Sequence, residues 1–430
     1  MVSVKDKAKQ MKLESSKMAT QPIEKRNEAL ACIADALVAN KAFIIEENKK
    51  DLKNAQEAGL ADPVIKRLKF DESKLNGVVD GIRELIKLPD PLFKTMLKRS
   101  LDEGLTLYRE TCAIGVIGVI FESRPDAMVQ ISTLCIKSGN CAILKGGSEA
   151  VNTNRAIFST IHEAAVKVGM PSYCLVQAEE RNEITELLDC HEYVDLLIPR
   201  GSNAFVQYIM NNTKIPVMGH ADGICHVYID SEADVEKAVK IVVDAKTQYV
   251  SVCNATETLL INEKIAGVIL PRLKEALEAK NVEIRGTKEV MDIISCIPAT
   301  DEDFETEYLD YILSIKLVKS LQEAVEHINY YGSHHTDAIV TENKENAEYF
   351  MQYVDSAGVY QNCSTRFADG FRYGFGAEVG VSTGKLHARG PVGLDGLVTY
   401  KYKLFGDGHI VDDYATGRKQ FHFVDEEFRA

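Results

Sequence analysis

The chain has 430 residues, of which 45% are hydrophobic and 27% charged, as is ordinary for a soluble globular protein. This length exceeds the size at which one hydrophobic core keeps growing, so we expect two or three domains. The net charge of −14 argues against a general affinity for nucleic acid or an anionic membrane, because either requires clustered Lys and Arg in excess.

No targeting or membrane segment is expected. Residues 1–21 carry charges throughout and lack the apolar stretch of a signal peptide, and no apolar run approaches the roughly 18 residues of a membrane span. The ten cysteines form no C-x-x-C pair and predict neither a disulfide framework nor a zinc site. A reducing, cytoplasmic setting is the simplest interpretation.

The first 95 residues predict helices. The segment 20–40 begins with a Thr20 cap and an early proline and carries apolar residues at the spacing of one helical face. The segment 71–91 repeats this pattern and stops at its two prolines, Pro89 and Pro91. We expect these helices to cover a sheet.

From residue 113, short apolar runs alternate with amphipathic stretches. Some of these runs, such as AIGVIGVIF (113–121), are apolar throughout, as is typical of strands buried on both faces, and VDLLIPRG (194–201) is a further short run. Strands that alternate with helices predict a parallel, doubly wound sheet, an architecture that often binds nucleotides.

A second α/β unit is predicted to begin near Lys246, with ATETLLIN (255–262) as an early strand. The end of the chain, TYKYKLFGDGHIVDDY (399–414), predicts a β-hairpin around its Gly-Asp-Gly turn. Such a hairpin would finish a sheet or pair with a neighbouring subunit.

Three predicted strand-to-helix turns suit an anionic ligand: FESRPDA (121–127), LKGGSEA (144–150) and IPRGSNA (198–204). Glycine lets a ligand approach the backbone there, and the amides of the next helix attract anions. An ordinary β-α turn is the alternative for any one of them. GFGAEVG (374–380) does not match the G-x-G-x-x-G motif, so a nicotinamide cofactor would not bind in the usual Rossmann manner.

Cys253 lies in QYVSVCNATETLLI (248–261), immediately before the predicted strand. A free cysteine is usually a packed hydrophobic residue, so composition alone does not distinguish Cys253 from the other nine. Cys225 and Cys363 also lie in conspicuous segments, whereas the remaining cysteines are interpreted as core thiols.

Four longer segments occur in a characteristic order: GVIFESRPDAMVQISTLCIKSGNCAILKGGSEA (118–150), CNATETLL (253–260), YQNCSTRFADGFRYGFGAEVGVSTGKLHARGPVGL (360–394) and TYKYKLFGDG (399–408). Together they resemble the γ-glutamyl phosphate reductase family, also called glutamate-5-semialdehyde dehydrogenases, of the aldehyde dehydrogenase superfamily. The resemblance extends from about residue 5 to the C-terminus.

The resemblance implies an aldehyde dehydrogenase-like α/β fold with a doubly wound parallel-sheet cofactor domain, a smaller α/β catalytic domain and a β oligomerisation hairpin. We expect the cofactor domain at residues 1–245, with a β excursion near 98–112 and a return of 375–430. The catalytic domain is expected at 246–374, and the hairpin at 396–415.

The resemblance also implies NADPH-dependent reduction of L-glutamyl 5-phosphate to L-glutamate 5-semialdehyde, with release of phosphate, in proline biosynthesis. Cys253 occupies the position of the nucleophile that would form a thioester. An ordinary cysteine is only a few per cent thiolate at pH 7, so activation is required. No His or Lys neighbour is evident in the sequence, although the amides of Cys253 and Asn254 suit an oxyanion hole.

Aldehyde dehydrogenases that release a free acid carry a base, Glu in E-L-G-G, that activates water. The corresponding segment here is VMGHADGICHVYID (217–230), with Gly219 or His220 near that position and no Glu. A base that activates water would waste the thioester by hydrolysis, so its absence fits a reductase. The usual Asn oxyanion donor is expected to be replaced by Ser123.

The resemblance assigns cofactor and substrate residues. The cofactor residues are Lys145, Gly146, Gly147, Ser148 and Glu149 for the adenosine ribose and its 2′-phosphate, Gly201 and Ser202 for the pyrophosphate, and Glu378 for the nicotinamide ribose. The substrate residues are Ser123, Arg124, Asn362, Ser364, Thr365, Arg366 and Arg389, with His387 a weaker candidate. The alternatives are a capped helix start with solvated charges and, for Glu378, a buried salt bridge.

Several interpretations remain open. His334 and His335 suggest a metal site, but no cysteine or carboxylate is spaced to complete one, so none is expected. A reductase of another acyl phosphate or of a CoA thioester is one rival, and a non-catalytic relic of the fold is another. A homo-oligomer is expected, as is a transient contact with glutamate 5-kinase, because acyl phosphates of glutamate cyclise readily.

Overall fold

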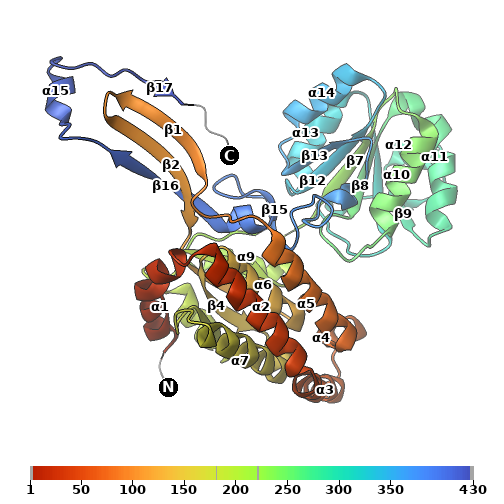
Figure 1. The fold of residues 1–430 in the computed structure, drawn as a ribbon. Coiled ribbons are helices and arrows are strands. Elements are labelled where there is room, and N and C mark those ends of the chain that lie inside the picture. Colours follow the sequence, from red (N-terminus) through yellow and green to blue (C-terminus); the bar gives the residue numbers. More distant parts are fainter. Residues whose placement is uncertain (1–2, 181, 220–221, 427–430) are drawn as a thin grey trace.

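A computed structural model describes residues 3–180, 182–219 and 222–426. It contains two α/β units and a separate antiparallel sheet that projects from them (Figure 1). The expected fold class is confirmed. Among the described residues, no helix combines the length and the apolar character needed to cross a bilayer.

The first unit is built on a parallel sheet of order β5-β4-β3-β6. Its strands are β3 (Val116–Phe121), β4 (Cys141–Gly146), β5 (Leu175–Ala178) and β6 (Leu196–Arg200). Every residue of β3 and β4 is buried, because helices cover both faces of the sheet. This burial explains why both strands are apolar almost throughout.

Nine helices of the described chain belong to the first unit. They are α1 (Val4–Ala19), α2 (Ile23–Ala39), α3 (Lys41–Glu57), α4 (Asp62–Leu68), α5 (Glu72–Lys87), α6 (Pro125–Lys137), α7 (Val151–Lys167), α8 (Asn182–Leu188) and α9 (Asn203–Asn211). Helices α2, α5, α6 and α7 pack on one another and share one hydrophobic core with the sheet. The two helices expected to cover the sheet, α2 and α5, therefore lie outside α6 and α7, which contact the strands themselves.

The second unit has a seven-stranded parallel sheet of order β10-β9-β11-β8-β7-β12-β13. The strands are β7 (Cys225–Ile229), β8 (Thr256–Asn262), β9 (Glu283–Gly286), β10 (Ile297–Pro298), β11 (Ile312–Val318), β12 (Thr336–Val340) and β13 (Gly358–Gln361). Separate apolar clusters cover its two faces.

Helices α10 (Val235–Thr247), α11 (Glu263–Glu278) and α12 (Lys288–Met291) pack on one face of this sheet, and α13 (Leu321–Tyr331) and α14 (Lys344–Tyr353) pack on the other (Figure 1). The expected domain boundary at 245/246 falls after β7 and α10, yet both elements belong to the second sheet and its core. The second unit therefore begins before β7 rather than near Lys246.

The projecting sheet has the order β16-β2-β1-β17. Its strands are β1 (Thr95–Asp102), β2 (Leu105–Ala113), β16 (Val398–Phe405) and β17 (Val424–Asp425), and α15 (Val411–Ala415) lies between the last two. The expected C-terminal hairpin at 396–415 is wrong, because β16 pairs antiparallel with β2 over its whole length. Residues 406–408 form a bend that leads from β16 into α15, and β2 supplies the partner strand.

A small antiparallel pair, β14 (Gly380–Ser382) and β15 (Gly390–Val392), lies between the two units in Figure 1. The pair belongs to the segment through which the chain passes from the second unit back to the first. Val379 and Val392 pack in the core of the first unit, so they attach this segment to it.

Candidate active site

The candidate site lies between the carboxyl ends of the strands in the first sheet and the amino ends of the strands in the second sheet. These two sets of strand ends are called the first edge and the second edge. In the first sheet, Phe121 is paired with Gly146 on one side and with Arg200 on the other, so the carboxyl ends of β3, β4 and β6 are level. In the second sheet, the residues of interest precede the amino ends of β7, β8 and β12. Asn203 of the first unit donates to Asp222 and to Glu307 of the second unit, at 2.5 and 2.8 Å, so the two edges are in contact.

Cys253 lies in a tight turn that precedes β8, and its side chain is half-buried. Ala255 N–H donates to the carbonyl of Val252, which closes the turn, and the Cys225 thiol donates to the Cys253 carbonyl at 3.2 Å. A Cβ atom on Gly223 would lie 2.5 Å from the Cα and from the Cβ of Cys253. Only glycine fits at residue 223 while Cys253 keeps this position.

His335 is the group that contacts the sulfur of Cys253. Its Nε2 lies 3.2 Å from Cys253 Sγ, and its Nδ1 lies 2.9 Å from Thr336 Oγ1. The ring is fully buried. The sequence suggested His334 and His335 only as metal ligands and showed no His or Lys neighbour for Cys253, so this contact was not predicted.

The topology of the sheet explains the contact. β7 lies between β8 and β12, with Cys225 opposite Thr256 and Val227 opposite Ala338. Cys253 and His335 each stand three residues before one of these paired positions. The signal in the sequence was that a histidine pair directly precedes the apolar run TDAIV, as Cys253 precedes TETLLI.

A third segment, around Thr365, holds the nucleophile turn from the other side. Thr365 Oγ1 donates to the carbonyl of Asn254 at 2.7 Å and lies 3.1 Å from Thr256 Oγ1. The Asn254 side chain in turn donates to the carbonyl of Ala368 at 2.8 Å. The structure therefore brings the predicted residues Asn254 and Thr365 together with Cys253, and Ser364 caps the same short turn.

Two arginines supply positive charge near the nucleophile. Arg366 donates through Nε to Gln248 Oε1 at 2.9 Å, and Arg200 donates to the carbonyl of Val379. Burial lowers the pKa of both guanidinium groups, while the nearby Cys253 sulfur acts in the opposite direction on each. Arginine nevertheless stays protonated in proteins, so both side chains are cations within electrostatic range of Cys253.

A buried ion pair lies directly behind the nucleophile turn. Lys246 Nζ, at the end of α10, is 2.5 Å from Glu257 Oε2 in β8, and both side chains are fully buried. Burial raises the pKa of the Glu257 carboxyl to about 7, against the pull of Lys246, and lowers the pKa of Lys246. These two residues flank the segment that contains Cys253.

At the edge of the first sheet, two backbone amides donate to the protein's own carboxylates. Ser123 N–H and Oγ–H donate to Glu149 Oε1 at 2.5 and 2.9 Å, with Ser123 at a φ of 48°. Ser202 N–H donates to Glu122 Oε2 at 3.3 Å. These turns therefore present donors to an anionic oxygen, as an anion-binding turn does.

The Ser123 hydroxyl bonds Glu149 of the neighbouring strand-to-helix turn, and its role as an oxyanion donor for Cys253 stays a prediction. Lys145 is buried, and its ammonium donates to the carbonyl of Gly146 at 2.7 Å. Burial lowers the pKa of Lys145, whereas Glu183, Glu149, Glu180 and Glu179 raise it, so this cation shares its surroundings with four carboxylates.

The remaining predicted residues make contacts of their own. Asn362, at a φ of 55°, bonds the backbone of Thr341 through both side-chain atoms. Arg389 pairs with Asp355 at 3.1 Å, and Arg124 pairs with Asp126 at 3.0 Å. Glu378 accepts from Gly370 N–H at 2.9 Å, and His387 Nε2 lies 2.8 Å from the carbonyl of Gly396. Each of these contacts is with a residue other than Cys253.

The segment that replaces E-L-G-G is only partly described. Gly219 lies against Pro199 at the end of β6, where a Cβ atom would be 3.8 Å from the proline ring. His220 lies outside the described residues. The prediction that this position carries no water-activating base therefore stays a prediction.

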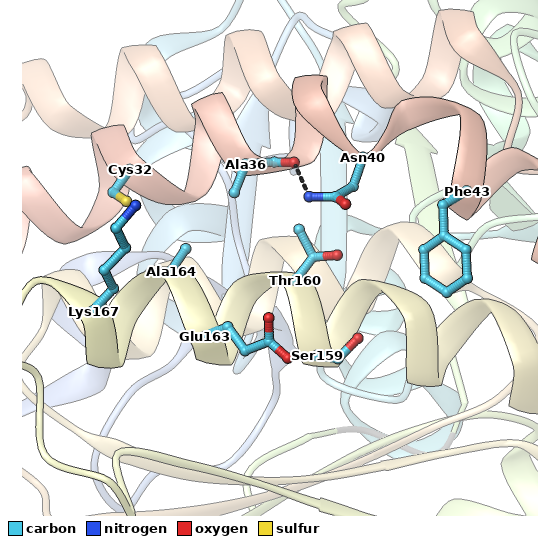
Figure 2. A pocket seen from close by; sticks show the side chains of 9 residues that line it. All are labelled: Cys32, Ala36, Asn40, Phe43, Ser159, Thr160, Glu163, Ala164 and Lys167. Carbon is cyan, nitrogen blue, oxygen red and sulfur yellow. Dashed lines mark hydrogen bonds between the residues drawn. The ribbon is translucent and has the colours of Figure 1, made fainter.

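Two cavities lie away from Cys253. One of about 340 Å³ is lined by α2 and α7, and Figure 2 shows Thr160, Glu163 and Lys167 of α7 facing Cys32 and Asn40. The other, of about 460 Å³, lies between the end of α5 and the returning segment and includes Arg389 in its wall. No other predicted site residue lines either cavity among the residues that the structure describes.

Comparison with known proteins gives close relatives. A model of the aldehyde dehydrogenase family matches residues 3–293. The gamma-glutamyl phosphate reductase of Acetivibrio thermocellus is 59% identical over 420 residues, which cover 98% of this chain and 97% of the relative. That of Ruminiclostridium cellulolyticum is 60% identical over 407 residues, which cover 95% of this chain and 94% of the relative.

Solved structures agree. The crystal structure of gamma-glutamyl phosphate reductase from Thermotoga maritima superposes with a TM-score of 0.92 at 39% identity and covers 94% of this chain and 99% of its own. An acetylating aldehyde dehydrogenase from Geobacillus thermoglucosidasius has a TM-score of 0.64 at 17% identity, covering 95% of this chain and 97% of its own. At that identity the second likeness concerns the fold alone.

Proposed function

Because the chain belongs to the γ-glutamyl phosphate reductases, within the aldehyde dehydrogenase family, we propose that it reduces L-glutamyl 5-phosphate to L-glutamate 5-semialdehyde with release of phosphate. The observation that carries the proposal is the environment of Cys253. His335 contacts its sulfur, and Arg200 and Arg366 lie in its surroundings. A thiol nucleophile beside cations suits an acyl donor whose leaving group is an anion.

The acyl-transfer step uses residues of the second sheet. Cys253 Sγ attacks the acyl carbon, the bond from that carbon to the phosphate oxygen breaks, and a thioester results. The backbone amides of Cys253 and Asn254 are our candidates for stabilising the oxyanion that develops on the carbonyl oxygen. The contacts from Thr365 and Gly223 hold this backbone in place, so the donors need not reorganise during the reaction.

Arg366 is our candidate for an anionic group of the substrate. Its Nε is bonded to Gln248, which orients the guanidinium while other N–H groups remain to bind a carboxylate or phosphate. We assign Arg366 and Ser364 to the substrate. Weaker candidates are Thr365, Arg124, Asn362, Arg389 and Ser123, because each is already bonded within the protein.

The residues at the first edge fit a dinucleotide. The amides of Ser123 and Ser202 already bind carboxylate oxygens, and Gly147 and Gly201 leave no room for a Cβ beside Glu149 and Glu122. We propose that Gly201 and Ser202 bind the pyrophosphate, that residues 145–149 bind the adenosine ribose, and that Glu378 binds the nicotinamide ribose. When bound, NADPH would supply the hydride that reduces the thioester.

The preference for NADPH over NADH depends on the charge near the 2′-phosphate. Lys145 is the cation we assign to that phosphate, and four glutamates surround it. The kcat/KM for NADPH divided by that for NADH measures the balance directly. A ratio below one would replace NADPH with NADH in the proposal and leave the acyl transfer intact.

The proposed function is tested by running the reaction backwards, with L-glutamate 5-semialdehyde, NADP⁺ and phosphate. We expect NADP⁺ reduction that requires phosphate and is lost in Cys253→Ser. Reduction that is indifferent to phosphate would contradict an acyl-phosphate product. Reduction that requires coenzyme A instead would favour the acyl-CoA rival, and no reduction at all would favour a non-catalytic relic.

The setting of the reaction is also part of the proposal. A thiolate nucleophile must stay reduced, so we propose that the enzyme works in the cytoplasm. A homo-oligomer is supported by β16, an edge strand whose residues Tyr400, Tyr402, Leu404 and Phe405 are all exposed. A transient contact with glutamate 5-kinase would protect the labile acyl phosphate. Coupled turnover no faster in a mixture than across a dialysis membrane would contradict that contact.

A further inference from the structure

Cys253 and His335, from distant parts of the chain, form a close pair. Nε2 of the imidazole lies 3.2 Å from the sulfur, although 82 residues separate the two in the chain. The thiol is half-buried and the ring is fully buried. A thiol and an imidazole at this distance are in position to share a proton.

The contact of the other ring nitrogen is compatible with the tautomer that a base requires. Nδ1 lies 2.9 Å from the hydroxyl oxygen of Thr336, which accepts a hydrogen bond when Nδ1 carries the proton. Nε2 is then the basic nitrogen, and it faces the sulfur. Thr336 therefore plays the part of an orienting group for His335.

The backbone holds the histidine as firmly as it holds the cysteine. His335 C=O accepts from Gly358 N–H at 3.0 Å, and His334 C=O accepts from Ala357 N–H at 2.9 Å. His334 itself has a φ of 60°, and its own Nδ1 lies 2.7 Å from the carbonyl oxygen of Asp355. Adjacent histidines thus point to different partners, and only His335 reaches the sulfur.

The charges around the pair favour separation of the proton from sulfur. Arg200 and Arg366 are the cations that interact with Cys253, and Cys225 is the neighbouring thiol. The buried carboxylate nearest to His335 along the chain, Asp337, is bonded to His226 and Ser356, and the one nearest to Cys253, Glu257, is paired with Lys246. Asp355, beyond His334, pairs with Lys385 and Arg389. Two cations near the sulfur would stabilise a thiolate.

We propose that His335 is the base that removes the thiol proton of Cys253 and the acid that protonates the departing phosphate. This inference rests on the proposed acyl-phosphate reaction and assigns a further catalytic residue to it. The proton passes from Sγ to Nε2, giving thiolate and imidazolium. The Sγ–C bond forms and the bond from carbon to the phosphate oxygen breaks. That oxygen keeps the electron pair of the broken bond and receives the proton from Nε2. Neutral His335 and the thioester remain, and no oxidation accompanies the step.

The test measures the alkylation rate of Cys253 by iodoacetamide between pH 5.5 and 9.5, without substrate or cofactor, with the labelled peptide identified by mass spectrometry. We compare the wild type with His335→Gln and, as a matched control, His334→Gln. The wild-type rate should rise with a midpoint below about pH 7.5, and that of His335→Gln near about pH 8.5, as for an ordinary thiol. At pH 6.5 the variant should react at least about tenfold more slowly, and at pH 9.5 the two rates should converge.

Two outcomes would overturn the proposal. In one, the alkylation rate of His335→Gln depends on pH as that of the wild type does. In the other, the rate of His335→Gln is lower by the same factor at every pH, which indicates a structural defect. If His335→Gln does not fold, Thr336→Val serves, because it removes only the orienting hydroxyl and should shift the midpoint upwards by a smaller amount. Thiolate absorbance near 240 nm, taken as wild type minus Cys253→Ser, gives the wild-type midpoint without any histidine variant.

The alkylation test separates this inference from the proposed function. Because no substrate is present, a shifted profile in His335→Gln supports the thiol–imidazole pair even if the semialdehyde and phosphate give no NADP⁺ reduction. An unshifted profile with intact phosphate-dependent reduction would refute the role of His335 alone.

Discussion

The two sheet edges that form the candidate site hold their groups in different ways. At the carboxyl edge of the first sheet, the amides of Ser123 and Ser202 donate to the protein's own side chains, Glu149 and Glu122. At the amino edge of the second sheet, Cys253 is fixed through its backbone by Cys225, by the close approach of Gly223, and by the neighbouring Thr365 contact.

The difference matches the chemistry proposed for each edge. A carboxylate at an amide can move aside when a phosphate arrives, so the first edge suits binding and release. A nucleophile gains most when its position is fixed before the substrate arrives, because a shift of about 1 Å can cost about 10²-fold in rate. Changes at the second edge should therefore have larger effects than changes at the first.

The largest effect is expected from Cys253→Ser. A serine hydroxyl remains protonated at neutral pH and cannot replace the thiolate, so kcat/KM of the reverse reaction should fall by about 10⁴-fold or more. Binding of NADP⁺, measured by calorimetry, should be unchanged because the first edge is untouched. Activity within tenfold of the wild type would show that Cys253 is not the nucleophile.

The next effect is on stability and concerns the buried pair behind the nucleophile turn. Lys246→Met would leave the Glu257 carboxylate buried without its cation, and we expect a loss of about 3–5 kcal/mol in the free energy of unfolding, measured with urea. Lys237→Met is the matched control on the same helix. Lys237 pairs with Glu342 at the surface, so its loss should cost about 1 kcal/mol or less. Equal losses would show that the buried pair contributes no more to stability than the surface pair.

A smaller effect on rate is expected from Gly223→Ala. The added methyl group would press on Cys253 and displace it, so kcat should fall by about 10²-fold while the NADP⁺ affinity is retained. Gly267→Ala, in α11, is the control, because a Cβ there meets nothing within 4 Å. If Gly223→Ala kept full activity, the fixed position of the turn would not matter for catalysis.

The smallest effect is expected at the first edge, from Glu122→Gln. Removing this charge from the Ser202 amide should tighten NADPH binding about two- to fivefold at low salt, the range of a charge at a helix N-terminus. Fluorescence titration measures the dissociation constant, with Glu24→Gln on the exposed face of α2 as the control. Weaker binding would mean that Glu122 holds the cofactor instead of yielding to it.

The first edge could be predicted from the sequence because its signals are local. Each turn joins a mainly apolar run to a helix start through small residues, so LKGGSEA and IPRGSNA both mark strand ends. The bonds of Ser123 and Ser202 to Glu149 and Glu122 were not foreseen, because they link separate turns. Their geometry depends on which strands are neighbours.

The second edge was predicted only in part. The resemblance identified Cys253 and the segment around Thr365, but His335 depends on β7 lying between β8 and β12, and nothing local encodes that order. The same cause explains the misplaced boundary, since CHVYI is a strand of the second sheet although it precedes Lys246. For β16, the turn residues were local but the partner strand was not.

The pairing of β16 with β2 also orders events during synthesis. Lys403 of β16 bonds Glu110 of β2 across 293 residues of chain, and the whole second unit lies between them. At about 5–20 residues per second, β2 waits roughly 15–60 s on the ribosome before its partner emerges. During that time the hairpin of β1 and β2 has an open edge, which is a site of aggregation in nascent chains. The projecting sheet is therefore completed only after both α/β units have been translated.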